Sequence, residues 1–306
     1  MKSMPSPRTT TVPRVLTSQP LSSVPWLIHG FSTRHGGFSR RYGGGALNLG
    51  FTRDDSRTAV GRNRRVFLEA LGAWRDKGMW PLVTLRQIHS DLIHCIASPP
   101  RHSLTGDGLI TSTPGILLAV QAADCLPVIL VDLEHCAVGA LHAGWRGTVK
   151  RIVEKAVGEL RRRFGCEPRR IKAAIGPGIH ACCYEVGSEV RERFESQFAY
   201  ASDLFREVSA PAPVRERPML FLSARPPGPG SMPNRLFLDL VEANRRQLVD
   251  AGVEPKNITA SPLCTACHRD LLFSYRAENA VTGRMLGAVG IRDKPRGDAG
   301  PRNSAP

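Results

Sequence analysis

Two short apolar segments separated by three residues constrain the fold more than any other feature of this sequence. Residues 127–132 (PVILVD) and 136–141 (CAVGAL) are rich in aliphatic side chains, and only Leu133, Glu134 and His135 connect them. A connection this short joins antiparallel strands, because parallel strands need a crossover of a dozen or more residues. We therefore predict a β-hairpin here, with further strands at 81–88, 116–122, 171–175 and 218–222.

Four other segments have helical spacing. They are residues 56–71, which Ser56 can cap and Gly72 can end, a segment after Thr148, and residues 188–198 and 239–250, the last closed by Ala251 and Gly252. The expected inward faces of the first two are Ala59, Val60, Asn63, Val66, Phe67, Ala70 and Leu71, and Val149, Ile152, Val153, Ala156, Val157, Leu160 and Phe164. Since a hairpin lies among helical crossovers, a regular doubly wound sheet is excluded. The sequence predicts one mixed α/β domain.

The two ends of the chain lack periodicity and are rich in Pro, Ser and Arg. We expect residues 1–22 and 292–306 to be disordered tails, which leaves 23–291 as a single folded domain with a Pro/Gly loop at 224–234. No apolar run reaches the roughly 18 residues that span a bilayer, and the N-terminus lacks the apolar core of a secretory signal. We therefore expect a cytoplasmic protein without a membrane segment.

The net charge of +15 raises the question of nucleic-acid binding. Basic residues gather near the N-terminus and between 161 and 172, where Glu167 is the only acid, and the rest are scattered. No basic stripe is interleaved with the aromatic side chains on which bases stack. A solvated basic surface is the expectation, nucleic acid is not expected as a partner, and small anionic substrates would also benefit from the charge.

Three side chains that can bind a metal follow predicted strands. They are His89 in RQIHSD, Cys125 in AADCLPV and His142 in LHAGWRGT. One thiolate and two imidazoles suit zinc, and three protein ligands leave the fourth tetrahedral position open, as in catalytic rather than structural sites. From spacing alone, each residue could equally be packed in the core.

Two glycine-rich segments carry an arginine next to a histidine. HAGWRGT places Arg146 at a strand-to-helix junction, where backbone amides favour an anion. STRHGG, from Ser32 to Gly37, combines Arg34 with the paired Gly36 and Gly37 in a similar way. Each segment could bind an anion or form an ordinary turn.

The segment LCTACH, residues 263–268, has the Cys-x-x-Cys-His spacing of c-type haem attachment. It could also be half of a zinc site, a redox pair or two packed thiols. Haem attachment is not expected in a chain without a secretory signal. The only other close cysteine pair, Cys182 and Cys183, is adjacent and poorly spaced to complete a zinc site, so a reactive thiol pair or plain packing remains for Cys264 and Cys267.

Ten segments, in order, resemble the YfiH-like family, called polyphenol oxidase or laccase-domain proteins and also purine nucleoside phosphorylases. The resemblance runs from about His29 to Ile291, over HGFSTRHGGFS, LNLG, NRRVFLEALG, RQIHSD, GDGLIT, AADCLPVIL, GALHAGWRGT, AAIGPGIHACCYEVGSEV, LDLVEANRRQL and LCTACHRDLLFSYRAENAVTGRM. It implies a YfiH-like mixed-sheet α/β sandwich with helices, the fold also labelled a CNF1/YfiH-like cysteine hydrolase fold.

The same resemblance implies a function and a site. It implies zinc on His89, Cys125 and His142, and phosphorolysis of adenosine, inosine and methylthioadenosine, with adenosine deamination as a side activity. A bacterial member has instead been associated with editing of peptidoglycan precursors. The resemblance also places Cys264, Ser274, Tyr275 and Arg276 near the substrate pocket.

For phosphorolysis the reaction needs an oriented phosphate and an electrostatic site for the developing charge. The first candidate for phosphate is Arg34 with the amides of Gly36 and Gly37, beside Ser32, and the second is Arg146. Asp124, next to Cys125, could shuttle a proton during deamination, hold a turn or orient a histidine.

Three rival functions use the same sequence differently. A copper oxidase is not expected, because a multicopper site needs many imidazoles and the nine histidines form no His-x-His pair. A cysteine hydrolase would use Cys125 as nucleophile with His142 or His89 as base. A non-catalytic nucleic-acid binder would rely on the +15 charge. The sequence sets neither the oligomeric state nor the preferred nucleoside.

Overall fold

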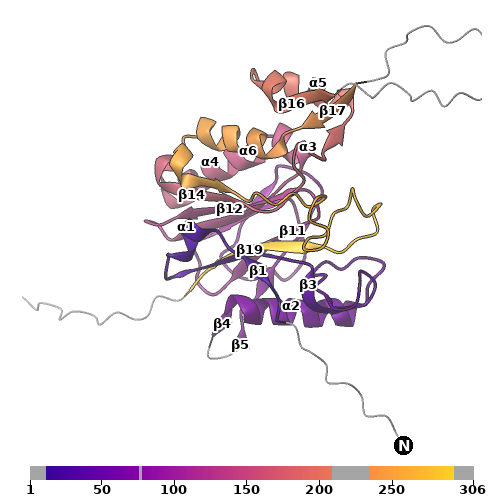
Figure 1. Ribbon diagram of the computed structural model, residues 1–306. Helices are drawn as coiled ribbons and strands as arrows, with labels where there is room; N and C mark the ends of the chain where they lie inside the picture. The colour runs from indigo at the N-terminus through magenta and orange to yellow at the C-terminus, as the bar shows by residue number, and fades with distance from the viewer. Residues whose placement is uncertain (1–11, 76–77, 209–233, 293–306) are drawn as a thin grey trace, which may run out of the picture.

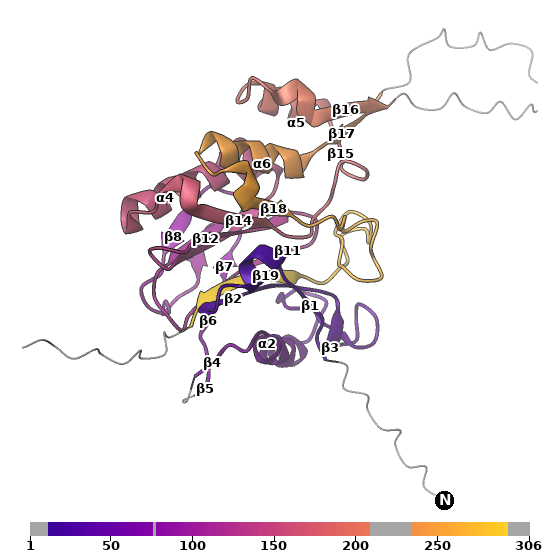
Figure 2. The ribbon, with the colours of Figure 1, turned by 60° about the vertical axis from the view of Figure 1, so that its left-hand side comes forward.

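Two β-sheets stacked face to face form the centre of the protein, and helices cover the outer face of each (Figures 1 and 2). The computed structural model describes residues 12–75, 78–208 and 234–292. One sheet has the strand order β1 (Val15–Leu16), β2 (Leu27–Ser32), β19 (Met285–Ile291), β11 (Leu117–Ala122) and β6 (Leu82–Val83). The other has the order β18 (Ile258–Ala260), β14 (Ile171–Ile175), β12 (Leu126–Asp132), β13 (Ala137–Ala143), β10 (Gly108–Thr111) and β8 (Ile93–Cys95).

Smaller elements surround the two sheets. A three-stranded sheet comprises β15 (Glu185–Val186), β17 (Arg235–Leu238) and β16 (Phe205–Val208), and two-stranded ladders pair β4 (Trp74–Arg75) with β5 (Gly78–Met79) and β7 (Leu85–Arg86) with β9 (Leu104–Thr105). A further strand, β3 (His35–Ser39), makes isolated bridges to Ala46. The α-helices are α1 (Gln19–Ser22), α2 (Arg57–Leu71), α3 (Trp145–Val149), α4 (Ile152–Phe164), α5 (Ser188–Glu195) and α6 (Leu240–Asp250), with 3₁₀ turns at Pro168–Arg170, Ala201–Leu204 and Pro255–Asn257.

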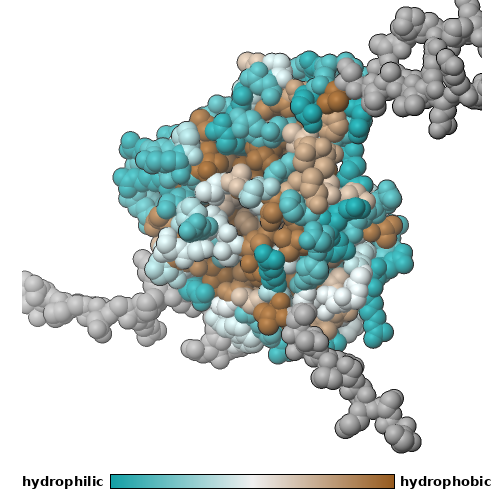
Figure 3. All heavy atoms as spheres, in the orientation of Figure 1, coloured by the Kyte–Doolittle hydropathy of each residue, from teal (hydrophilic) through white to brown (hydrophobic). Residues whose placement is uncertain are grey.

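Side chains that alternate between the two faces of each strand pack the layers together. In β11, Leu118 and Val120 face the second sheet, whereas Leu117 and Ala119 pack beneath Phe67 of α2. Successive strand residues point to opposite faces, so a strand buried on both sides is apolar throughout. On the other sheet, the outer residues of β12 and β13 pack against α4 and α6. The order of layers is therefore helix, sheet, sheet, helix. In the space-filling view of Figure 3, hydrophobic residues are visible in the middle of the face shown.

The central hairpin is confirmed. β12 and β13 pair antiparallel, with Asp132 opposite Ala137 and Leu126 opposite Ala143. Parallel pairs at β8/β10, β14/β18 and β6/β11 make both large sheets mixed, as the sequence predicts. The segment predicted as one strand at 81–88 differs, because its two halves, β6 and β7, belong to separate sheets. The strand predicted at 218–222 lies outside the described residues, as does nearly all of the loop predicted at 224–234.

The predicted helices are present. α2 begins after Ser56, whose Oγ accepts a hydrogen bond from the Ala59 amide at 3.5 Å, and ends at Gly72, where φ is 68°. Its expected inward residue Ala70 is exposed. The helix expected after Thr148 is interrupted, since Arg151 adopts a left-handed conformation (φ 63°) and separates α3 from α4.

The expected N-terminal tail is too long. Val15 pairs with Ser32 across β1 and β2, and Leu21 of α1 is 1% exposed in the core between the sheets. Leu21 is buried and Val15 half-buried by packing on the sheet, so residues 15–22 belong to the fold. Residues 1–11 and 293–306 lie outside the described residues. Within the described part, no helix has both the length and the apolar character needed to cross a membrane.

Candidate functional site

The structure brings His89, Cys125 and His142 together at one end of the sheets. His89 follows β7, Cys125 lies in the turn between β11 and β12, and His142 is the penultimate residue of β13. Their potential ligand atoms all lie within 4.8 Å of one another. The Cys125 Sγ is 3.8 Å from the His89 Nε2, and the two imidazole rings are 4.9 Å apart between centroids. Three residues that are far apart in sequence thus form one compact donor set.

A buried carboxylate, Asp107, positions both histidines. Its Oδ1 accepts a hydrogen bond from the His142 Nδ1 at 2.8 Å and from the His89 amide at 3.0 Å, and its Oδ2 accepts from the amide and hydroxyl of Ser90. An ionised carboxylate only accepts, so the Nδ1 of His142 carries a proton and its Nε2 is left for Cys125 or a metal. Burial raises the pKa of Asp107, but hydrogen bonds from His142 and Ser90 outweigh burial and hold the pKa well below its ordinary value.

Cys125 and the buried His142 shift each other's pKa in opposite directions. Burial raises the pKa of the Cys125 thiol, but attraction and hydrogen bonding to His142 and His89 lower it overall, to about 6. Burial lowers the pKa of His142, and the Cys125 thiolate and Asp107 raise it overall, to about 9. Near neutral pH the pair therefore favours a thiolate beside an imidazolium, and a thiolate is the form that binds metals or acts as a nucleophile.

Gly144 allows the cysteine and histidine to approach the start of α3. A Cβ atom on Gly144 would lie 2.7 Å from the Cys125 Sγ, which is too close for a carbon atom, and 3.1 Å from the His89 Cδ2, which is a tight contact. The first glycine of HAGWRGT thus serves close packing at the donor set. Its φ of −80° is open to any residue, so the restriction comes from space alone.

Asp124 is an anchor for a neighbouring loop. Its Oδ1 accepts hydrogen bonds from the hydroxyls of Thr265 (2.6 Å) and Ser274 (2.7 Å), and its Oδ2 accepts from the Arg276 amide (2.6 Å). These bonds hold Asp124 in a strained left-handed conformation, with φ at 94°. Of the roles left open by the sequence, holding a turn fits these contacts, while orienting a histidine falls to Asp107.

A cavity of about 620 Å³ opens over the donor set. This volume is within the range of small-molecule sites, roughly 300–1,000 Å³. The sequence-predicted residues that line it are His89, Asp124, Cys125, His142, Arg146, Tyr275 and Arg276, and the others are Leu85, Arg86, Gln87, Gln121, Ala123, Trp145, Tyr184 and Arg284. Four of these lining residues are arginines, and their positive charge suits the cavity to an anionic ligand.

Arg34 and its neighbours, the first candidate for phosphate binding, do not line this cavity. The Arg34 guanidinium donates to the carbonyls of Arg269, Leu272 and Tyr42 and forms an ion pair with Glu278 at 3.2 Å. The Gly37 amide donates to the Gly45 carbonyl, Gly36 is buried in β3, and the Ser32 Oγ accepts from the Leu286 amide. These polar groups are already bonded within the protein, and none of the four residues lines the cavity.

Two further expected pocket residues, Ser274 and Cys264, do not line the cavity. Ser274 is fully buried and bonds to Asp124. Cys264 lies in a separate cluster with Cys182, Cys183 and Cys267. The loop that carries them does reach the cavity, through Tyr275 and Arg276.

Asp107 and several residues of the cavity wall were not predicted from the sequence. Asp107 stands between Gly106 and Gly108, immediately before the buried strand β10, and an acid in that setting was the available signal. Arg86 ends β7 and Gln121 is the penultimate residue of β11, and strand ends are where sites are commonly built. Tyr184 gave no signal, because only the folding of its loop brings it to the cavity.

The sequence of the chain is similar to those of known proteins of one family. The family described as "Multi-copper polyphenol oxidoreductase laccase" matches residues 28–292. Purine nucleoside phosphorylase YlmD from Geobacillus stearothermophilus is 34% identical over 276 residues, which is 87% of this chain and 91% of that protein. Adenosine deaminase RL5, from an unknown prokaryotic organism, is 34% identical over 271 residues, 86% of this chain and 93% of that protein.

A solved structure has the same fold. The crystal structure of the hypothetical protein YfiH from Bacillus licheniformis superposes with a TM-score of 0.73 at 32% identity, and covers 87% of this chain and 93% of that one. The expected mixed α/β fold is thereby confirmed. The cysteine hydrolase label attached to that expectation stays a prediction.

Proposed function

The chain belongs to the YfiH-like family of multi-copper polyphenol oxidoreductase laccases, and we propose that it is a zinc-dependent purine nucleoside phosphorylase. In the proposed reaction the bond between C1′ of the pentose and N9 of the purine breaks, and a phosphate oxygen bonds to C1′. The products are a free base and a pentose 1-phosphate. Adenosine, inosine and methylthioadenosine are the proposed substrates, and adenosine deamination is a proposed side reaction of the same site. The name of the relative RL5 supports the deamination.

One observation carries this proposal. His142, oriented by Asp107, presents its Nε2 toward Cys125 beside His89, at the edge of a cavity that four arginines line. Positive charge suits phosphate, and the cavity is large enough for a nucleoside. The names of similar proteins point to the same chemistry.

The donor set fits zinc. Two imidazoles and one thiolate, with an open fourth position, are a catalytic zinc arrangement, and a carboxylate on the second nitrogen of a ligating histidine is its usual support. When bound, zinc would supply a Lewis acid at the edge of the cavity. A multicopper centre needs more imidazoles than this group offers. We therefore propose zinc at this site, although the description of the family names copper.

Phosphate binding falls to Arg146 in this proposal, with Arg86 beside it. Within the described residues, the guanidinium groups of these two side chains donate no hydrogen bond to the protein, whereas Arg276 donates to the Glu185 carbonyl and Arg284 to those of Thr282 and Gly283. A guanidinium without internal partners is available for two parallel hydrogen bonds to phosphate oxygens. Arg146 also stacks on the ring of Trp145, 4.4 Å from its centroid, which fixes its direction.

The purine and pentose would contact the aromatic and amide residues of the wall. Burial raises the pKa of Tyr184 above its ordinary value, so its hydroxyl stays neutral and can donate a hydrogen bond. The Gln121 side-chain amide makes no hydrogen bond within the described part of the chain, although its backbone is held by Gln87. An amide that offers both a donor and an acceptor suits a purine edge.

The test is a phosphate-dependent assay. The zinc-loaded chain should convert inosine to hypoxanthine and ribose 1-phosphate, with no hypoxanthine formed when phosphate is left out. Arg146→Ala should raise the KM for phosphate at least tenfold, while Arg193→Ala, an exposed arginine of α5, should leave it unchanged. Equal phosphate KM values in both variants would remove Arg146 from the site, and absence of any nucleoside turnover would refute the phosphorylase.

The alternative functions predict different results. As a cysteine hydrolase, the chain would use the aligned Cys125, His142 and Asp107 without metal, and alkylation rather than chelation would abolish its activity. As a peptidoglycan-precursor editing enzyme, it would act on cell-wall precursors and need no phosphate. A mass-spectrometric screen of nucleosides and cell-wall precursors, with and without phosphate and with and without chelator, separates the three.

A further inference from the structure

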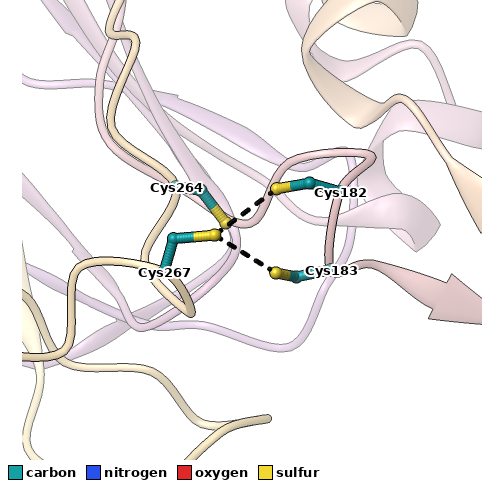
Figure 4. Close-up of side chains that lie close together, drawn as sticks. All are labelled: Cys182, Cys183, Cys264 and Cys267. Atoms are coloured by element: carbon teal, nitrogen blue, oxygen red, sulfur yellow. Dashed lines mark hydrogen bonds between the residues drawn. The ribbon is translucent and has the colours of Figure 1, made fainter.

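Four cysteines form a second cluster apart from the donor set of the cavity. Cys182 and Cys183, in a first loop between β14 and β15, and Cys264 and Cys267, in a second loop between β18 and β19, point their sulfurs toward one another (Figure 4). Cys267 Sγ lies 3.6 Å from that of Cys182 and 3.4 Å from that of Cys183, and all four sulfurs are within 4.8 Å of one another. The adjacent pair that looked poorly spaced in the sequence is thus brought to the Cys-x-x-Cys pair by the fold.

Backbone contacts independent of the sulfurs hold the two loops together. Gly178 forms a parallel bridge with Cys264, and the Thr265 amide donates to the Gly178 carbonyl at 2.9 Å. Gly178 has no room for a side chain, because a Cβ there would lie 2.4 Å from the Leu126 side chain and 2.9 Å from the Asp124 carbonyl oxygen. The His180 amide points at the Cys264 Sγ, 3.4 Å away. An amide directed at a sulfur stabilises a thiolate, which is the form that binds a metal.

The spacing of the sulfurs is close to that of a tetrahedral metal site. With Zn–S bonds of about 2.3 Å, the sulfurs of a regular tetrahedron lie about 3.8 Å apart. A disulfide would need about 2.05 Å between two of them. We propose that Cys182, Cys183, Cys264 and Cys267 bind one Zn²⁺ ion through four thiolates, in a closed structural site separate from the catalytic one. Thiolate ligands select thiophilic metals over the hard cations Mg²⁺ and Ca²⁺.

This site would brace the cavity wall. Tyr184 follows Cys183 directly and lines the cavity, while Thr265 follows Cys264 and bonds to Asp124. Tyr275 and Arg276 are further along the second loop, and Arg276 donates to the carbonyl of Glu185, which begins β15 directly after the first loop. A metal ion on the cysteines therefore fixes the relative position of two loops that each supply wall residues.

Metal content of the whole chain tests the proposal. The chain is purified under reducing conditions, incubated with Zn²⁺, desalted and measured by inductively coupled plasma mass spectrometry. Cys267→Ser and Cys182→Ser, both at exposed positions, should each bind about one Zn²⁺ fewer per chain than the unsubstituted protein. Cys95→Ser, a half-buried cysteine outside the cluster, should bind as much as the unsubstituted protein.

A second background separates this site from the proposed catalytic one. Cys125→Ser should retain the zinc of the cluster, and adding Cys267→Ser should remove it. With Co²⁺ in place of zinc, the thiolate-to-metal charge-transfer absorption should fall in Cys267→Ser and persist in Cys125→Ser. Circular dichroism confirms that each variant is folded.

Two outcomes would overturn the four-cysteine site. The first is full zinc content and an unchanged cobalt spectrum in both Cys267→Ser and Cys182→Ser. The second is a mass lower by two hydrogens in the reductant-free chain, mapped by peptide analysis to these cysteines while zinc is present, which would make the cluster a thiol–disulfide pair. Loss of phosphorylase activity alone would concern only the proposed function.

Discussion

The Asp107 carboxylate accepts a hydrogen bond from the Nδ1 of His142 at 2.8 Å, and this single contact sets which imidazole nitrogen faces Cys125. The same carboxylate also accepts bonds from the backbone of residues 88–90, so it joins the two histidines of the donor set into one unit. A residue behind the metal ligands thus determines their arrangement.

Replacing Asp107 should weaken zinc binding without removing any ligand. In Asp107→Asn the charge that supports His142 is lost, and an amide can also turn its donor toward the histidine. Loss of such support typically costs about 10- to 100-fold in metal affinity. Competition with a chromophoric chelator measures the effect. Asp91→Asn, which removes the half-buried ion-pair partner of Lys155, is the control and should bind zinc normally. An unchanged affinity in Asp107→Asn would show that the contact is dispensable.

The pH dependence of alkylation should distinguish Cys125 in the metal-free chain. Its pKa is lowered to about 6, so the thiolate forms above that pH and the rate with iodoacetamide should level off by about pH 7, below the range where an ordinary thiol, with a pKa of about 8.5, ionises. Burial and Asp132 raise the pKa of Cys166 to about 12, so it should not react over this range. Peptide mass spectrometry reports each cysteine separately.

The control for this experiment removes the cationic partner. In His142→Gln the imidazolium is absent, and the inflection for Cys125 should move upward by more than one pH unit. An inflection near pH 8.5 in the unsubstituted metal-free chain would contradict the thiolate–imidazolium pair.

Local sequence signals predicted much of the fold. The Ser56 cap, the Gly72 stop and the apolar spacing between them determine α2 from within one segment, and the three-residue connection determines the hairpin of β12 and β13. The donor set could be predicted from the sequence for a similar reason. His89, Cys125 and His142 each lie at or just beyond the end of a strand, and strand ends meet at one edge of a sheet. Such signals need no knowledge of distant contacts.

The remaining features depend on contacts between distant segments. Cys182 and Cys183 meet Cys264 and Cys267 only because the loops that carry them run side by side, across more than 80 positions of sequence. An arginine beside glycines, as at Arg34, can point at a ligand or at main-chain carbonyls, and the sequence does not distinguish the two. The N-terminal strand β1 is two residues long and gave no periodicity to detect.

Arg34 and Arg146 should have opposite effects when replaced. Arg34→Ala removes a donor from three carbonyls and the ion-pair partner of the half-buried Glu278, so the free energy of unfolding should fall by about 1–3 kcal/mol. The KM for phosphate should stay unchanged. Arg146→Ala should raise that KM and leave stability within about 0.5 kcal/mol. Urea unfolding and initial-rate assays measure the two quantities. A phosphate KM that rises with normal stability in Arg34→Ala would restore it as a ligand-binding residue.

Gly144 tests whether close packing at the donor set is required. In Gly144→Ala the backbone conformation is accessible to alanine. The new methyl group would lie 2.7 Å from the Cys125 Sγ and 3.1 Å from the His89 side chain, so Cys125 must move away from position 144. A displacement of this kind can cost about 100-fold in rate. Zinc content and phosphorolysis should therefore both fall, with the far-ultraviolet circular dichroism unchanged.

Gly158→Ala provides the matched comparison for this change. Gly158 is exposed in α4 and has no atom within 4 Å of the position that its Cβ would take, so alanine should raise the free energy of unfolding by about 0.5–1 kcal/mol and leave zinc content as it is. If Gly144→Ala instead binds zinc and turns over inosine as well as Gly158→Ala does, the donor set tolerates a wider spacing. The absence of a side chain at position 144 would then have no part in the function.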